Sequence, residues 1–132
     1  MSYGTTTTVD QPFGPTLAAV KDALKAQGFG VLTEIDMAAT LKAKLDVDIA
    51  PQVILGACNP PLAYRALQAE DQIGLLLPCN VVVRSLPDGR TEVAAIDPQV
   101  LVTMTGNAAL AAVADDAGSR LSAALRGLLP TT

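Results

Sequence analysis

The chain has 132 residues, half of them hydrophobic and without a long polar tract, so we expect a single domain over residues 1–132 with its own core. Only 3% of the residues are aromatic, and the formal net charge is −4. These values argue against nucleic acid as a partner, because phosphate binding needs a clustered positive surface. We find no secretion signal and no apolar run of membrane-spanning length, so we expect a cytoplasmic protein without a membrane partner.

Histidine is absent, and the two cysteines are Cys58 and Cys79. The absence of histidine excludes Ser-His and Cys-His nucleophiles, the usual zinc triads and a histidine pH switch. In a reducing compartment the cysteines would stay thiols. Three interpretations of them remain open, namely small buried apolar residues, a redox pair, or ligands of a soft metal ion.

The first part of the chain begins with the threonine-rich residues 3–9, whose β-branched side chains predict a polar edge strand. The spacing of apolar residues then predicts a helix over 13–27, a strand over 29–35 and a second helix over 37–45. Gly28 is expected to end the first helix, and Asp36 can cap the second through its carboxylate.

The most informative run, residues 53–67, changes from strand to helix within a few positions. A short apolar stretch that begins at Val53 suits a buried strand. Asn59 can cap a helix, and Pro60 fits the first helical position, where a missing N–H costs nothing. Cys58 is therefore expected just outside a helix N-terminus.

The next elements are predicted from proline and glycine positions. Pro78 interrupts an apolar run, so the regular strand should begin at Cys79, with Val81 and Val83 on one face. Residues 86–90 predict a hairpin turn, and a strand follows over residues 91–96.

The last part of the chain is helical. Asp97 and the proline after it predict the start of a short helix that Gly106 ends. Asn107 is expected to cap the longest helix, which Pro130 should end. The order of all elements indicates an α+β domain with two layers, a mixed sheet of about five strands packed against helices.

Four sequence blocks carry a resemblance to a known family. They are GFGVLTEID, LGACNPPLAYRAL, IGLLLPCNVVV and IDPQVLVTMTG, in this order along the chain. With these blocks the chain resembles domain-of-unknown-function family 302 from about Tyr3 to Leu128. The resemblance implies a small prokaryotic α+β domain that is often a homodimer, and it supplies no catalytic residues.

The candidate site comprises Cys58, Asn59, Arg65, Cys79 and Asn80. A thiol at a helix N-terminus is favoured as thiolate by the helix dipole. Because strands that follow each other in sequence are usually neighbours, we expect Cys58 and Cys79 to approach each other. Asn59 and Asn80 could also have purely structural roles, as a helix cap and a turn at the start of a strand. Arg65 could bind an anion near the helix start, or it could be a solvated or salt-bridged surface residue.

The leading functional hypothesis is a homodimeric small-ligand or metal-binding module with its site near Cys58. The metal ligands would be Cys58 and Cys79, holding a soft ion such as Cu(I), or zinc across a dimer interface. The alternative is a thiol-based redox or sulfur-transfer enzyme with Cys58 as nucleophile and Cys79 as resolving thiol. A third possibility is a purely structural interaction module. The homodimer is expected from the excess of apolar helix surface.

Overall fold

The computed structural model describes residues 2–128, which form one sheet and the helices around it. The strands are β1 (Gly4–Val9), β2 (Gly30–Asp36), β3 (Gln52–Cys58), β4 (Cys79–Ser85) and β5 (Thr91–Ile96). The helices are α1 (Phe13–Ala26), α2 (Met37–Leu45), α3 (Pro60–Ala69), α4 (Gln99–Thr105) and α5 (Ala111–Arg126), with short 3-10 turns η1 (Ile73–Leu76) and η2 (Ala108–Leu110). No helix in this part of the chain is long and apolar enough to cross a membrane.

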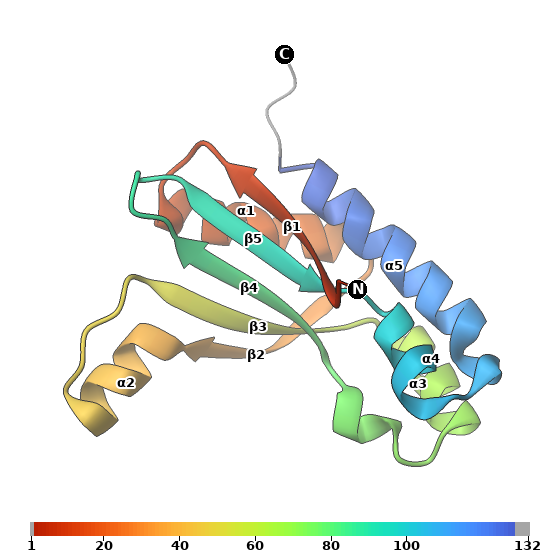
Figure 1. Ribbon diagram of the computed structural model, residues 1–132. Coiled ribbons are helices and arrows are strands. Elements are labelled where there is room, and N and C mark those ends of the chain that lie inside the picture. The colour runs from red at the N-terminus through yellow and green to blue at the C-terminus, as the bar shows by residue number, and fades with distance from the viewer. Residues whose placement is uncertain (1, 129–132) are drawn as a thin grey trace.

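The sheet has the strand order β1-β5-β4-β3-β2, and every neighbouring pair is antiparallel (Figure 1). The α+β class, the two layers and the five strands predicted from the sequence are confirmed. The sheet is wholly antiparallel where a mixed sheet was expected. The difference arises because the helical connections reverse the chain direction between neighbouring strands. Helix α2 joins β2 to β3, and α3 with η1 joins β3 to β4.

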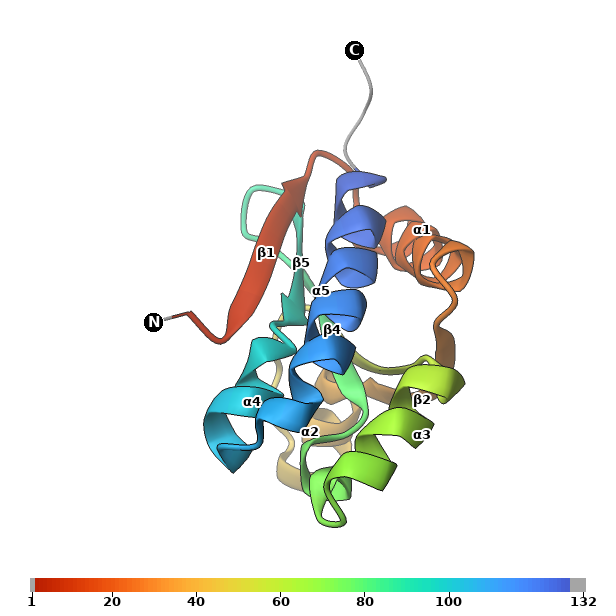
Figure 2. The same ribbon diagram turned by 90° about the vertical axis from the view of Figure 1, so that its right-hand side faces the viewer.

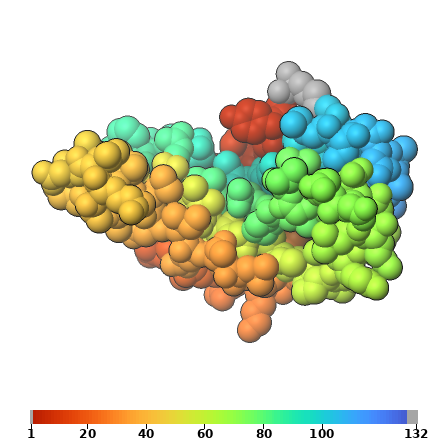
Figure 3. Space-filling view, turned by 90° about the horizontal axis from the view of Figure 1, so that it is seen from below, coloured from red at the N-terminus to blue at the C-terminus, as the bar shows by residue number. Residues whose placement is uncertain are grey.

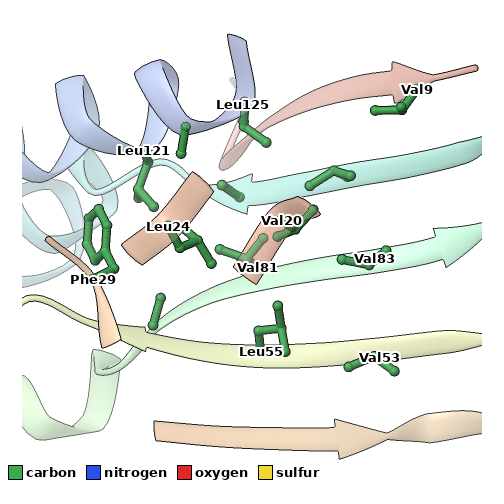
Figure 4. Packing of buried hydrophobic residues seen from close by; sticks show 14 residues of the cluster. Val9, Val20, Leu24, Phe29, Val53, Leu55, Val81, Val83, Leu121 and Leu125 are labelled. Carbon is green, nitrogen blue, oxygen red and sulfur yellow. The ribbon is translucent and has the colours of Figure 1, made fainter. Parts of the chain in front are cut away.

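One face of the sheet is covered by α1 and α5, which close the main hydrophobic cluster (Figure 1 and Figure 4). The cluster comprises Val9, Val20, Leu24, Phe29, Val53, Leu55, Ala57, Val81, Val83, Val93, Ala95, Leu121, Ala124 and Leu125. Alternation along the strands places Val81 and Val83 on this face, as the sequence predicted.

Local polar contacts fix several element ends where the sequence predicted them. The Asp36 carboxylate accepts a 2.9 Å hydrogen bond from the Ala39 amide at the start of α2. Gly28 and Gly89 both adopt a φ of 86°, which favours glycine, at the end of α1 and in the β4–β5 hairpin. Asn107 caps the turn η2 rather than α5 itself, because the chain tightens into this turn before the helix begins. Pro130 lies outside the described residues.

The other face of the sheet carries a row of apolar side chains. Ile35, Ile54, Val82 and Ala94 are register partners across β2, β3, β4 and β5. Helix α2 has no buried residue and belongs to neither hydrophobic cluster. Figure 3 shows it, in yellow, standing out at one end of the molecule.

Candidate functional site: an apolar cavity beside Cys58

A second, smaller hydrophobic cluster lies where helices close the ends of the central strands. It comprises Leu62, Ala66, Ile73, Leu101, Leu110, Val113 and Ala117, from α3, η1, α4, η2 and α5. Figure 2 shows the chain that leads into β4 passing between α3 and α4. This cluster is built from helices alone, so no strand ladder fixes the spacing of its parts.

Between the two clusters lies a cavity of about 280 Å³, called here the Cys58 cavity. Its lining residues are Phe29, Leu32, Ala57, Cys58, Asn59, Leu62, Ala63, Ala66, Leu77, Pro78, Cys79, Leu101, Val113 and Ala117. None of them is charged, and the amide of Asn59 is the most polar side chain. A space lined in this way suits an apolar molecule.

Asn59 builds one corner of the cavity by starting α3. Its Oδ1 accepts a 3.2 Å hydrogen bond from the Leu62 amide, and Pro60 occupies the first helical position, so the predicted cap is confirmed. The Asn59 Nδ2 lies 3.0 Å from the place where a side chain on Gly28 would begin. Glycine at the end of α1 therefore leaves room for this amide.

Leu32 borders the cavity at the surface of the molecule. It lies at an irregularity in the β2–β3 register, between Val31 and Thr33. Such bulges turn a side chain away from the alternating pattern of the strand. Leu32 is 66% exposed although it lines the cavity, so the cavity reaches solvent beside it.

Both cysteines line the cavity as half-buried, free thiols. Cys58 is opposite Gly30 on β2, and Cys79 is opposite Ala57 on β3, the residue before Cys58. Both thiols are free and no disulfide joins them, so the expected cysteine pair is not shown. Burial, and to a smaller extent the charge of Cys58, raises the pKa of the Cys79 thiol to about 11. Cys79 is therefore protonated at neutral pH.

The remaining predicted site residues lie outside the Cys58 cavity. Arg65 is exposed on α3, and Asn80 is exposed on β4 opposite Gly56. The structure thus gathers Cys58, Asn59 and Cys79 around one space but not the other two residues.

The residues that sequence reasoning missed are the apolar ones, such as Leu101 and Val113. Their periodicity predicted that they are buried. It carried no signal that they also line a cavity.

The metal hypothesis has few side chains to support it. Within residues 2–128, no group of three or more His, Cys, Asp or Glu gathers as a metal site would require. A zinc ion commonly takes four ligands, and here only two thiols are at hand. A thiol with a raised pKa is also a weaker ligand, because metals bind the thiolate.

A larger groove, of about 520 Å³, runs between the end of β5 and α5. It is polar, and its polar groups bond to each other. The side-chain Nε2 of Gln99 donates to the Asp115 Oδ1 at 2.6 Å, and the backbone N–H of Gln99 donates to the Asp97 Oδ1 at 3.0 Å. These contacts occupy Asp97, Gln99 and Asp115, and the groove lacks the apolar lining of the Cys58 cavity, so it is the weaker candidate for an apolar molecule.

The fold and the cavity together define a small α+β domain whose helices close one end of an antiparallel sheet around an apolar space. The family model described as "Domain of unknown function DUF302" matches residues 5–128, so the chain belongs to the DUF302 family, as its four sequence blocks predicted. The crystal structure of an uncharacterized conserved DUF302 protein from Bacillus stearothermophilus is similar to this chain, and the two sequences are 34% identical. The match covers 96% of this chain and 98% of that one, with a TM-score of 0.88. No curated protein matches.

Proposed function

We propose that this DUF302 domain binds a small apolar molecule in the Cys58 cavity. The observation that carries the proposal is the lining, which is uncharged throughout and almost wholly apolar. An apolar cavity of roughly 150 Å³ is known to stay dry and to take up benzene, so a space of about 280 Å³ is large enough for such a ligand.

The chemistry of Cys79 favours this proposal over a thiol enzyme. A resolving thiol must form a thiolate to attack, and the raised pKa of Cys79 keeps it protonated at neutral pH. A neutral thiol inside an apolar lining acts instead as a small, polarisable contact surface.

Benzene titration by calorimetry and by thermal unfolding tests the proposal. Benzene should bind the wild-type protein and raise its melting temperature with increasing concentration, because the ligand binds only the folded state. Ala63→Leu places three extra carbon atoms in the cavity from a half-buried position on α3, and it should weaken benzene binding about tenfold.

The matched control is Ala112→Leu, the same change at an exposed position on α5 that does not line the cavity. It should leave benzene binding unchanged. Absence of benzene binding to the wild-type protein, or equal weakening by both variants, would refute the proposal.

We also propose that the domain forms a homodimer through the sheet face opposite α1 and α5. The apolar row Ile35, Ile54, Val82 and Ala94 supports this, because such a row can pack on its own copy about a two-fold axis. Beside the row, Arg84 and Glu92 form an ion pair with a nitrogen–oxygen distance of 2.9 Å. These opposite charges could exchange partners across the same axis.

Sedimentation at micromolar concentration tests the dimer. The wild-type protein should sediment as a dimer, and Val82→Lys should make it a monomer by placing a charge in the middle of the row. Tyr64→Lys, at an exposed position on α3, is the control and should leave the dimer intact. A wild-type monomer in both low and high salt would contradict this proposal.

A further inference from the structure

A second cavity adjoins the first, and the two share a wall. This space of about 200 Å³ is called here the Asn80 cavity. It is lined by Leu75, Leu76, Leu77, Pro78, Cys79, Asn80, Ile96, Asp97, Pro98, Val100 and Leu101. Four residues line both cavities, namely Leu77, Pro78, Cys79 and Leu101.

The Asn80 cavity exists because β4 and β5 separate at this end of the sheet. Their register begins only at Val81 opposite Ala95, whereas Cys79 and Asn80 are paired on the β3 side alone. The end of β5 pairs instead with β1, where Ile96 is opposite Gly4. The space between the two strands is left to helix α4 and to the segment that precedes β4.

Two of the four wall residues, Leu77 and Pro78, lie between the turn η1 and strand β4. The backbone hydrogen bonds at η1 are short-range, from Ile73 to Glu70, from Leu75 to Gln72 and from Leu77 to Gly74. Ile73 is fully buried and anchors the segment, whereas Leu75 is 81% exposed. Residues 73–78 belong to no strand, so a shift of Leu77 and Pro78 would break no strand ladder.

The charges of the residues that line the two cavities favour a ligand with an uncharged head group over one with a carboxylate. Neither lining contains Lys or Arg, and the only charged lining residue is Asp97, in the Asn80 cavity. A carboxylate placed there would be repelled by Asp97 and would find no Lys or Arg in either lining. A hydroxyl could donate to Asp97 and accept from the Asn80 amide.

We infer that the ligand is an unbranched aliphatic molecule with an uncharged, hydrogen-bond-donating head group. Its chain fills the Cys58 cavity and passes Cys79, and its head lies between Asn80 and Asp97. The inference rests on the proposed function, which it deepens by naming the ligand class. The first cavity alone is smaller than the roughly 300–1,000 Å³ of typical ligand pockets, and the second brings the total into that range.

Calorimetry with 1-octanol, octanoate and benzene at neutral pH tests the inference. 1-Octanol should bind at least about tenfold more tightly than octanoate, because both have the same chain length and only octanoate is repelled by Asp97. Val100→Phe narrows the Asn80 cavity from a half-buried position that does not line the first cavity. It should weaken 1-octanol about tenfold while changing benzene binding less than about twofold.

The matched control is Val102→Phe, also half-buried on α4 but in neither lining, which should leave both ligands unaffected. If Val100→Phe does not fold, nuclear Overhauser contacts between 1-octanol and the Val100 methyls of the wild-type protein replace it, and their absence overturns the inference. Octanoate binding as tightly as 1-octanol, or Val100→Phe sparing 1-octanol, also overturns it. If any of these results is obtained while benzene still binds the wild-type protein, the inference fails and the proposed function stands. If benzene does not bind the wild-type protein, the proposed function itself has failed.

Discussion

The interior of the main hydrophobic cluster and the region where the second cluster meets it differ in how much empty space they hold. Within the main cluster a cavity of only about 10 Å³ remains, whereas the Cys58 cavity beside the second cluster measures about 280 Å³. The main cluster sets branched side chains from three central strands against α1 and α5 (Figure 4). The second sets helix against helix, with Ala63, Ala66 and Ala117 at positions that border the space.

We infer that the main cluster chiefly stabilises the fold, whereas the region around the Cys58 cavity is available for binding. Close packing gains dispersion contacts that an empty space forfeits. Strands held in a ladder present their side chains at fixed spacing, so complementary residues fill the face. Helices that cap the strand ends have no such constraint, and small residues on them leave room.

The largest expected effect compares one leucine from each cluster. Leu55→Ala removes a fully buried side chain from the main cluster and should lower the free energy of unfolding by about 4 kcal/mol. Leu101→Ala, in the second cluster, should cost only about 2 kcal/mol, because Leu101 already borders two cavities and gives up fewer contacts. Urea unfolding of both variants measures the difference. Equal losses would mean that the two clusters are equally well packed.

An intermediate effect concerns alkaline pH. The pKa of Cys79 is raised from 9.0 to about 11, so the folded state disfavours its thiolate. The free energy of unfolding should therefore fall as the pH rises from about 9 through about 11, by on the order of 2 kcal/mol. Cys79→Ala should lose this part of the pH dependence, and Cys58→Ala should retain most of it, because burial is the larger cause of the raised pKa. The same alkaline slope in wild type and Cys79→Ala would show that Cys79 is not shielded in the cavity wall.

A smaller effect concerns the helix that forms one wall of the cavity. Asn59→Ala removes the cap of α3 and should cost about 1 kcal/mol in urea unfolding. Asn80→Ala, at an exposed strand position, is the control and should change the free energy of unfolding by less than about 0.5 kcal/mol. If Asn59→Ala matches this control, the wall does not depend on the cap.

Local chemistry made much of the fold predictable from the sequence. Asn59 before Pro60 indicated the start of α3, and Pro78 indicated that β4 begins at Cys79, because each signal acts within a few residues. The wholly antiparallel pairing could not be predicted, since it depends on which strands meet after the helices form. The apolar run at residues 73–77 likewise became the turn η1 rather than a return strand.

The candidate site was predictable only in its polar members. Cys58, Asn59 and Cys79 were singled out by residue type and position, and they do line one cavity. The space between Leu62, Leu101 and Val113 depends on the distance between α3, α4 and α5. Periodicity records which residues face inward but not how far apart the facing helices settle.

The most direct test of ligand binding is to locate bound benzene by nuclear Overhauser contacts to assigned methyl groups. Contacts should appear to the methyls of Leu62, Leu101 and Val113, which line the Cys58 cavity. The methyls of Val20 and Val93, inside the main cluster, should show none, because the cavity there is too small for a ring. Contacts to the main cluster, contacts confined to the exposed sheet face, or none at saturating benzene would contradict binding in the Cys58 cavity.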